Sequence, residues 1–516
     1  MDTLGVVGGA AVAASRHEAR ELAALSSIAE RERFRDRYWR SRDPIYEDRL
    51  LWRAQSFRHL VHLLPGQSIL ELGAGEGMFT RQLLAVSRGE NPITAVTFTE
   101  PHAQLDPLPA PVEMISAVTL RALAGRRFSF VIAIDLLDRS NSPWLLQQQY
   151  DLLEPGGQLV LYESNPWNPV LKLRRALGRL VGQHDPRRLL DRPSLYELLS
   201  EIGYIRTFAI FNDFVYAPLA RWMIWPLRNL SILLENTPGI RLLAGSILIH
   251  AQKPPRVAVR PDVSLCEHPS LLGAISAVVP CHNEEMNVGP LVANLVRYYD
   301  DYLHEIVLVD DNSTDRTAEV IRELAGKDPR IRPVFRTPPN GVGRAIADGF
   351  RASTGRYVLS MDCDFQHLLP EIRDLFDAAA EGYDVVIGSR FSRHSILLNY
   401  PFQKIFANRA FHLIARVLLR IPTRDLTNNL KLMRREVVDR LDLTQTGFAV
   451  NAETGLQPVM MGYRVREVPI SWINRTPDMG VSSFRLAKVG GGYFQVLMNM
   501  ALGKFGARGV PPRGRP

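Results

Sequence analysis

The sequence predicts an α/β protein made of two different domains. Short apolar runs alternate with helical stretches twice along the chain, and a proline-rich segment separates the two patterns. This alternation is typical of a parallel sheet with helices on both faces. With 516 residues, of which 46% are hydrophobic and 22% charged, the chain can form two to four folding units. The same composition excludes a disordered or fibrous protein.

The charge balance is basic, with 62 Lys and Arg against 54 Asp and Glu and a net charge of +8. This modest excess favours phosphate-bearing ligands or an anionic membrane surface, and by itself does not indicate nucleic acid. Cys266, Cys281 and Cys363 form no Cys-x-x-Cys pair, so we expect no disulfide framework and a reducing compartment. We read neither a secretory signal nor a spanning helix, and we expect a cytoplasmic protein at the cytoplasmic face of the membrane.

The pattern divides the chain at four positions. Residues 1–46 are expected to be a helical extension, because Leu22, Leu25 and Ile28 have helical spacing. Loss of periodicity around the Lys-Pro-Pro-Arg and His-Pro sequences predicts a linker at 255–272. The α/β domains then cover 47–254 and 273–490, and 491–516 is an apolar and then basic tail that we expect to be partly disordered.

A glycine-rich loop follows the first strand of the first domain and leads into a helix over 78–86. We expect the strands of this domain at Ser68–Leu72, Ile93–Thr99, Val112–Ile115, Phe130–Ile134 and Gln158–Tyr162. The loop glycines Gly73, Gly75 and Gly77 allow a sharp turn and let a ligand approach the helix N-terminus.

Acidic residues around this loop narrow the class of ligand. Glu71 and Glu76 would repel a pyrophosphate, which argues against NAD or FAD and favours a ligand with a cationic amino-acid end. Glu100 closes the next strand, where a doubly wound fold places the carboxylate that binds ribose hydroxyls. A solvated loop residue is the alternative for Glu100.

From about Glu47 to Pro254 the sequence resembles the class I S-adenosylmethionine-dependent methyltransferases. The residues that carry the resemblance are the glycine-rich loop, the strand Phe128–Val131 and the turn Leu153–Gly157. The resemblance implies a Rossmann-like fold and S-adenosylmethionine as cofactor. The cofactor-binding residues that it implies are Glu71, Gly73, Gly75, Gly77, Glu100 and Asp135, with Asp135 near the methyl-transfer site.

The first domain also departs from that family. Ser116 and Ala117 stand where an acidic residue near the adenine is common. No base for a methyl acceptor stands out; His102 and Tyr162 are candidates, and a structural role is the alternative for each.

In the second domain, polar motifs follow three expected strands, Ile275–Val279, Glu305–Val309 and Tyr357–Met361, and Val385–Ile387 is a fourth strand. The carboxyl ends of parallel strands are where open α/β sheets bind ligands. In an extended segment, Asp362, Asp364 and Gln366 send three oxygen donors to one side. Such donors suit Mg²⁺ or Mn²⁺ shared with substrate phosphates, whereas a helix cap, the alternative, explains one carboxylate only.

From about Ala274 to Tyr493 the sequence resembles family 2 glycosyltransferases of the GT-A fold, and among them the dolichyl- and polyprenyl-phosphate mannosyl- and glucosyltransferases. The resemblance implies that Pro280, Asn283, Glu284, Asp311 and Asp362 bind the nucleotide sugar. It also implies that Asp362, Asp364 and Gln366 hold the metal, and that Asp364, Arg390, Lys431 and Arg475 are the catalytic set, the three cations facing the phosphates. The motifs are Pro280-x-x-Asn283-Glu284, Val309-Asp310-Asp311-x-Ser313-x-Asp315-x-Thr317, Met361-Asp362-x-Asp364-x-Gln366, Gly388-Ser389-Arg390-Phe391 and Asp425-Leu426-Thr427-Asn428-Asn429-Leu430-Lys431.

Together the resemblances predict a bifunctional enzyme. One domain would move a hexose, with inversion, from a GDP-mannose or UDP-glucose type of donor to a polyprenyl phosphate, and the other would be a methyltransferase. A lipid phosphate is already an anion, so this transfer needs no strong general base. The segment after Arg475 departs from the family, because Ser483 stands where a Lys is common and Arg485 is the nearest replacement.

Three alternatives remain open. The acceptor is a saccharide or a metabolite, with Asp364 or Glu453 as base; the first domain is a non-catalytic scaffold; or the whole chain is a binding module. Peripheral membrane contact has two candidate segments, Tyr493–Leu502 and Trp222–Trp225, for which a packed core helix is the alternative.

Overall fold

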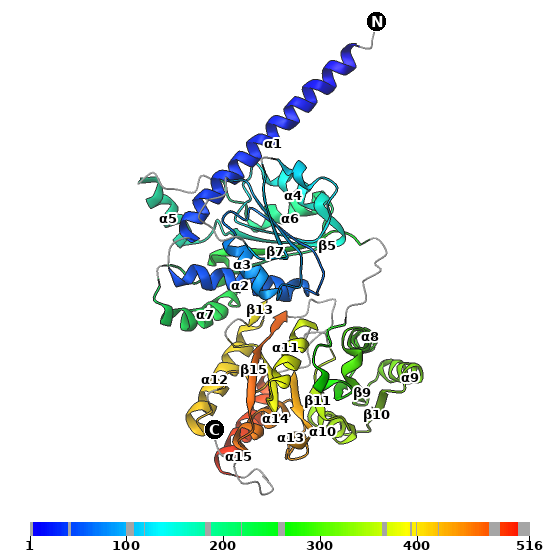
Figure 1. Cartoon of the computed structure of the whole chain (residues 1–516). Helices are drawn as coiled ribbons and strands as arrows, with labels where there is room; N and C mark the ends of the chain where they lie inside the picture. The colour runs from blue at the N-terminus through cyan, green and yellow to red at the C-terminus, as the bar shows by residue number, and fades with distance from the viewer. Residues whose placement is uncertain are drawn as a thin grey trace. The chain divides into compact units, whose positions relative to one another are not determined.

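The computed structural model describes residues 4–39, 43–99, 108–117, 119–180, 187–217, 219–255, 264–363, 369–392, 395–398, 400–421, 423–473 and 486–503. The chain divides into two compact units, Met1–Arg260 (unit 1) and Pro261–Pro516 (unit 2), and each unit contains its own seven-stranded sheet (Figure 1).

The sheet of unit 1 has the strand order β3-β2-β1-β4-β5-β7-β6. The first five strands are parallel, as predicted, whereas β7 runs antiparallel to both β5 and β6. In this order β1 lies beside β4, with β2 and β3 on one side of the pair and β5 on the other. The direction of the strand order therefore reverses between β1 and β4, and such a switch point is where open α/β sheets bind ligands. The strands are β1 (Ile69–Leu72), β2 (Ile93–Thr97), β3 (Val112–Ser116), β4 (Phe128–Ile134), β5 (Leu153–Ser164), β6 (Ile205–Asn212) and β7 (Ser246–Gln252).

Helices cover the sheet because its central strands are apolar on both faces. Every residue of β1 and β4 is buried, so both sides need a partner layer. The expected turn Leu153–Gly157 is instead the start of β5, where Leu153 pairs with Phe128 before a register shift. The helices of unit 1 are α1 (Leu4–Trp39), α2 (Pro44–Val61), α3 (Met78–Val86), α4 (Ser142–Leu152), α5 (Pro169–Leu180), α6 (Arg192–Ile202) and α7 (Arg221–Glu235).

Helix α1 belongs partly to the core of unit 1. Leu25 and Ile28 are 4% and 0% exposed and lie in the main apolar cluster with Leu70 and Leu72 of β1. The second half of the helix is therefore fixed on the sheet, which brings its polar side chains to the glycine-rich loop.

The sheet of unit 2 has the order β10-β9-β8-β11-β14-β12-β15, with β14 antiparallel to β11 and to β12. A separate pair of parallel strands, β13 and β16, forms a small second sheet. The strands are β8 (Ile275–Cys281), β9 (Leu303–Asp310), β10 (Ile331–Phe335), β11 (Tyr357–Ser360), β12 (Val385–Ser389), β13 (Ile396–Leu398), β14 (Lys431–Arg434), β15 (Val465–Pro469) and β16 (Ser471–Ile473).

The helices of unit 2 pack closely on this sheet. A Cβ atom on Gly349 would lie 2.4 Å from Val278 Cγ1, so glycine lets one helix approach β8. Val496, Leu497 and Met500 are buried in the core, so one side of the predicted interfacial segment 493–502 is a packing face. The helices are α8 (Val288–Tyr299), α9 (Thr317–Lys327), α10 (Val342–Ala352), α11 (Leu369–Ala380), α12 (Phe402–Leu419), α13 (Arg435–Val438), α14 (Val450–Met460) and α15 (Leu486–Ala501).

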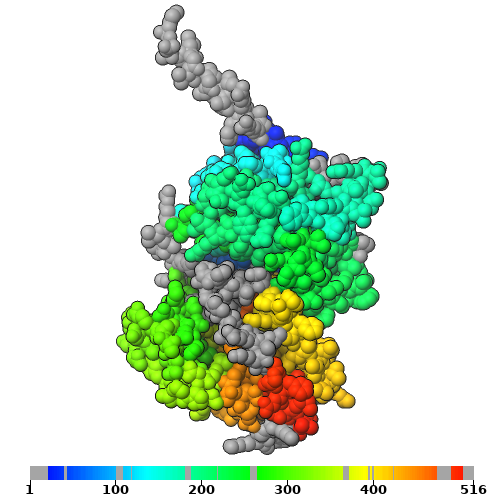
Figure 2. Space-filling view, turned by 180° about the vertical axis from the view of Figure 1, so that it is seen from behind, coloured from blue at the N-terminus to red at the C-terminus, as the bar shows by residue number. Residues whose placement is uncertain are grey.

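Helices α12 and α15 contact each other, and their surfaces lie side by side in Figure 2, coloured yellow and red. Within the part of the chain that the structure describes, no helix is both long and apolar enough to cross a bilayer.

Candidate functional site

Two loops at the carboxyl ends of β8 and β9 hold each other in unit 2. The backbone N–H of Asn283 donates to Ser313 Oγ (3.0 Å), and Asn283 Oδ1 accepts from the backbone N–H of Thr314 (2.8 Å). The backbone N–H of Glu284 donates to Thr317 Oγ1 (2.8 Å). Asn283 has a φ of +56°, a conformation that asparagine tolerates better than most residues. The two loops therefore form one hydrogen-bonded rim.

Asp311 lies beside this rim and is buried. Its backbone N–H donates to Cys281 O (2.8 Å), and its carboxylate accepts from the backbone N–H of Gly341 (2.7 Å) and pairs with Arg336. The sequence-predicted nucleotide-binding residues Pro280, Asn283, Glu284 and Asp311 are thus brought together at adjoining strand ends, and their contact with a nucleotide stays a prediction.

Asp362 follows β11, the strand on the other side of β8. Its Oδ1 accepts from Asn429 Nδ2 (2.8 Å), and Asn429 Oδ1 accepts from Ser360 Oγ (2.7 Å). Because β11 pairs with β14, this contact joins the Asp362 motif to the Asp425–Lys431 motif. A half-buried carboxylate held by an amide fits the oxygen donors that a hard divalent cation prefers. Asp364 and Gln366 lie outside the described residues.

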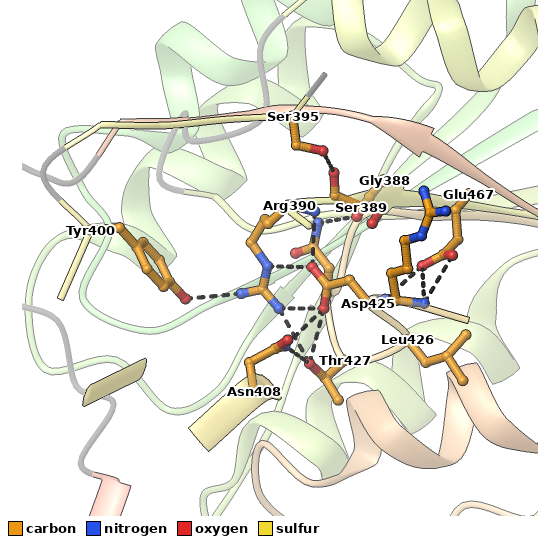
Figure 3. Close-up of polar contacts among 12 residues, drawn as sticks. Gly388, Ser389, Arg390, Ser395, Tyr400, Asn408, Asp425, Leu426, Thr427 and Glu467 are labelled. Carbon is orange, nitrogen blue, oxygen red and sulfur yellow. Dashed lines mark hydrogen bonds and ion pairs between the residues drawn. The ribbon is translucent and has the colours of Figure 1, made fainter. Parts of the chain in front are cut away.

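Arg390 and Asp425 form a buried pair of ions. Arg390 Nε and Nη2 donate to the two carboxylate oxygens of Asp425 at 2.7 and 2.8 Å, and its backbone N–H donates to Oδ2 at 2.9 Å (Figure 3). Burial alone would raise the pKa of Asp425, but the charge and hydrogen bonds of Arg390 outweigh it and hold that pKa well below its usual value. The pair is therefore ionised at neutral pH.

Other side chains fix this pair from three directions. Glu467 of β15 accepts from the backbone N–H groups of Arg424 (3.0 Å) and Asp425 (2.6 Å). Arg390 Nη1 donates to Tyr400 Oη (3.2 Å), and Asn408 Nδ2 donates to Asp425 Oδ1 (3.0 Å), as Figure 3 shows. What these contacts establish is the position of Arg390; its contact with phosphate stays a prediction.

Lys431, at the start of β14, is 1% exposed. Its ammonium donates to Asn428 O (2.6 Å), Asn451 O (2.9 Å) and Thr454 Oγ1 (2.9 Å). Burial lowers the pKa of this lysine to about 7. As placed, the ammonium contacts protein oxygens with all three of its N–H bonds, so the predicted contact with phosphate requires an exchange of partners. Arg475 lies outside the described residues, as do Ser483 and Arg485.

Two polar residues of α12 were not found by sequence reasoning. The Nδ1–H of His412 donates to Asn408 O (2.8 Å), and its Nε2 accepts from the backbone N–H of Leu426 (2.8 Å). Burial lowers the pKa of His412 to about 4, so the ring is neutral at pH 7. The sequence does contain a signal for this pair: Asn408 and His412 stand four residues apart, and this spacing places two polar side chains on one face of a largely apolar helix.

Glu453, the candidate base for a saccharide acceptor, is 3% exposed. It accepts from the backbone N–H groups of Thr444 and Gln445 at 3.0 Å and from the Thr444 hydroxyl at 2.5 Å. Burial raises the pKa of Glu453. These contacts favour a role in positioning the 444–445 loop.

In unit 1, the glycine-rich loop is covered by α1. Gly73, Gly75 and Gly77 have φ values of +73°, +55° and +72°, which glycine alone adopts readily. The backbone N–H of Glu76 donates to Asp36 Oδ2 (3.1 Å). A Cβ on Gly75 would lie 2.0 Å from that same oxygen. The sequence predicted the loop but not its contact with α1.

Two further α1 residues contact the same loop. The backbone N–H of Gly75 donates to Glu32 Oε1 (3.4 Å), and Arg35 Nη2 donates to Gly73 O (2.6 Å). Glu71, 3% exposed, accepts from Thr80 Oγ1 (2.7 Å). Burial raises the pKa of both Glu32 and Glu71 to about 7. The loop is thus surrounded by carboxyl groups.

Asp135 directly follows β4 and has a φ of +56°. It is ion-paired with Arg31 (3.7 Å) and Arg187 (3.4 Å), and it accepts from Ser164 Oγ (2.6 Å). Burial alone would raise its pKa, but the two arginines hold it well below the usual value. Tyr162 is fully buried and donates to the backbone carbonyl of Arg53, contacts that favour the structural alternative for this residue. Glu100 and His102 lie outside the described residues.

The fold and the strand-end motifs of unit 2 define a glycosyltransferase. Residues 276–442 match the model of glycosyl transferase family 2. A polyprenol monophosphomannose synthase of Mycolicibacterium smegmatis is 30% identical over 245 residues, which are 46% of this chain and 89% of that protein. The chain belongs to glycosyl transferase family 2, and its C-terminal half has the GT-A fold.

Other similar proteins are more distant or more partial. A dolichol-phosphate mannosyltransferase of Pyrococcus furiosus is 32% identical over 181 residues, 35% of this chain and 51% of that protein. A crystal structure of glucosyl-3-phosphoglycerate synthase from Mycobacterium tuberculosis with Mn²⁺ and UDP-glucose is 19% identical with a TM-score of 0.35, and covers 45% of this chain and 79% of that one. This last likeness adds nothing to the family assignment.

Proposed function

We propose that unit 2 transfers a hexose from a nucleotide sugar to a polyprenyl phosphate, with inversion and with Mg²⁺ or Mn²⁺. The observation that carries the proposal is the meeting of two strand ends with one loop. Asp311 and Asp362 lie at the ends of β9 and β11, and Asn429 ties Asp362 to the segment that holds Arg390. Both curated relatives are named for transfer of mannose to a polyprenol or dolichol phosphate.

The half-buried Asp362 carboxylate fits a divalent ion, which would be held by Asp362 with Asp364 and Gln366 and would neutralise the departing diphosphate. An acceptor phosphate oxygen forms the bond to the anomeric carbon from the side opposite the diphosphate, whose bond to that carbon breaks. Arg390, fixed by Asp425, would offset the repulsion between the two phosphate groups. The acceptor phosphate is already ionised, so no side chain has to remove a proton.

The contacts of Glu453 favour this acceptor over a saccharide hydroxyl. A hydroxyl acceptor needs a base, for which there are two candidates. Glu453 is already engaged by Thr444 and Gln445, and Asp364, outside the described residues, is assigned to the metal. A phosphate acceptor needs none.

We expect organic-soluble label when the full chain is given polyprenyl phosphate, Mg²⁺ or Mn²⁺ and one of labelled GDP-mannose, UDP-glucose or UDP-N-acetylglucosamine. Only the matching donor should react, since the proposed contacts at the ends of β8 and β9 would be specific for one nucleotide. A parallel reaction with free sugars in place of the lipid is the control. Label transferred to sugars and not to lipid would contradict the proposed acceptor.

We infer that unit 1 binds S-adenosylmethionine and is a methyltransferase. Its support is the glycine-rich loop at the switch point between β1 and β4 and the carboxyl groups of Glu32, Asp36 and Glu71 around it. Carboxylates suit the ammonium and sulfonium charges of that cofactor and repel a pyrophosphate. The alternative, a non-catalytic scaffold, is favoured by one observation: Glu32 and Asp36 already accept the loop N–H groups.

Calorimetry separates these two possibilities. Binding of S-adenosylmethionine should tighten about tenfold between pH 5.5 and pH 7.5. Burial raises the pKa of Glu32 and Glu71 to about 7, so at the lower pH both carboxyl groups are neutral and do not attract the cationic cofactor. Glu71→Gln should weaken binding and flatten this pH dependence, whereas Glu154→Gln, far along the chain on β5, should keep it. If no heat of binding is measured at millimolar S-adenosylmethionine, the non-catalytic scaffold is the remaining interpretation of unit 1.

We also propose that unit 2 contacts the membrane in which a polyprenyl acceptor resides. Helix α12 exposes a row of apolar side chains toward solvent, with Arg416 and Arg420 exposed beside them. A helix with this pattern lies in the headgroup region with its apolar side down. The exposed apolar residues of α12 are Phe406, Leu413, Ile414, Val417 and Leu418.

A further inference from the structure

Helix α5 of unit 1 is amphipathic, yet none of its twelve residues, all of them described, is buried. Leu173, Leu177 and Leu180 are 60%, 54% and 82% exposed, and their spacing puts them on one face. Lys172 and Arg179 point away from that face at helical spacing. In a soluble protein an apolar helix face normally packs on the core, so this one needs another explanation.

The orientation of α5 is fixed by hydrogen bonds rather than by apolar packing. Asn168 Oδ1 accepts from the backbone N–H of Leu171 (2.7 Å), and Asn168 Nδ2 donates to Tyr216 Oη (2.6 Å). Arg174 donates to Ala217 O and Arg175 to Arg187 O. The helix is therefore held at the border of unit 1, where Figure 1 draws it, while Leu173, Leu177 and Leu180 stay exposed.

More apolar side chains lie next to α5. Asn165 Nδ2 donates to Leu242 O (2.9 Å) and Asn168 Nδ2 to Leu243 O (2.5 Å), which brings the short helix η2 (Ile240–Leu243) beside the start of α5. The side chains form what we call the interfacial patch, each at least 37% exposed: Trp167, Leu173, Leu177, Leu180, Ile240, Leu242 and Leu243.

We propose that the interfacial patch docks unit 1 onto an anionic lipid bilayer. Charge complementarity favours a bilayer as the occupant: residues 167–180 contain four basic residues and not one Asp or Glu, and Lys172 and Arg179 among them are exposed. Leucines on one face of a helix, with lysine and arginine away from that face, are the pattern of a helix that lies in the headgroup region of anionic lipids.

The docked surface is next to the candidate site of unit 1. Helix α5 begins five residues after Ser164, which donates to Asp135, and Arg175 contacts the same Arg187 that is paired with Asp135. The patch would therefore hold the end of β4 near the headgroups. The consequence for the methyl acceptor, that it belongs to a lipid or a lipid-linked molecule, rests on the proposed function of unit 1.

A local probe tests the docking in the full chain. We replace Cys266 by serine, since Cys281 and Cys363 are buried, and label a Leu177→Cys variant with an environment-sensitive dye. Vesicles of phosphatidylcholine containing roughly a third phosphatidylglycerol should shift the emission to the blue, and brominated lipid should quench it. Vesicles of phosphatidylcholine alone should give little change, and high salt should weaken the response. A dye at Leu272→Cys, 49% exposed and outside the patch, is the control.

A second variant measures the contribution to affinity. Leu173→Glu with Leu177→Glu should weaken sedimentation with the anionic vesicles at least about tenfold, because two apolar contacts are lost and two negative charges are added. Thermal unfolding should not change, since neither leucine is buried.

The outcomes separate this inference from the proposed function. Vesicle binding without any change at position 177 would overturn the docking of α5 and leave contact through α12 standing. Equal responses to neutral and anionic vesicles would contradict the charge argument. Glycosyl transfer measured in detergent, and S-adenosylmethionine binding without lipid, report on the proposed activities whatever the vesicles show.

Discussion

Asp362→Asn should lower kcat/KM for glycosyl transfer by about 1,000-fold and raise the Mn²⁺ concentration needed for half-maximal rate. The substitution keeps the size of the side chain and its contact with Asn429, but removes the negative charge that would hold the cation. Initial rates measured across a series of Mn²⁺ concentrations, with donor and acceptor held constant, give both quantities. Asp364→Ala should lose activity to the same degree, and a chelator should do so in the unmodified chain.

Two matched variants make this test specific. Asn429→Ala removes the amide that positions Asp362 and should cost about 10- to 100-fold, the usual effect of a group that supports a metal ligand. Asp377→Asn changes a carboxylate of α11 that is bonded to His268 at 2.8 Å, and it should leave the rate nearly unchanged. Full activity of Asp362→Asn at limiting Mn²⁺ would remove Asp362 from the metal site.

The parallel cores of both sheets could be predicted from the sequence because their signals are local. Strands β1, β4 and β8 are short, almost wholly apolar runs bounded by glycine or polar residues. Strands β6 and β14 were missed for physical reasons. The first half of β6 is exposed or only half-buried at the sheet edge, and β14 begins with Lys431, a residue type that is less common in strands.

The residues of the candidate sites likewise fall into those that the sequence predicts and those that it does not. Residues that follow a strand within one motif, such as Asn283 and Asp362, could be predicted because the strand end itself fixes their place. The contacts of Glu32 and Asp36 with the glycine-rich loop join positions about forty residues apart in the chain, and no periodicity announces them. The enclosure of the Lys431 ammonium depends on a carbonyl of its own motif and on a carbonyl and a hydroxyl of α14, so it too required the folded structure.

Asp425→Asn should give the largest loss of stability, about 3–5 kcal/mol in the free energy of unfolding of unit 2. The substitution leaves the Arg390 guanidinium buried without its counter-ion, and the desolvation of that charge is no longer offset. Urea unfolding followed by the near-ultraviolet signal of Trp472, which lies against Arg390, should report the transition of this unit. Arg390→Lys keeps the positive charge and should lower the free energy of unfolding less than Asp425→Asn does. It should still destabilise the unit, because an ammonium cannot bond both carboxylate oxygens as the planar guanidinium does.

The pH dependence of the same pair gives an independent check. The folded pKa of Asp425 lies below its ordinary value of 3.8, so the stability it contributes is present above that pH and is lost as the pH falls through the folded pKa. Asp425→Asn should remove this acid-dependent part of the unfolding free energy while leaving that of unit 1, where Asp135 has a lowered pKa of the same origin. If Asp425→Asn unfolded at the urea concentration of the unmodified chain, the pair would be a bystander, and the rigid placement of Arg390 on which phosphate binding depends would have to come from Tyr400 and Thr427 instead.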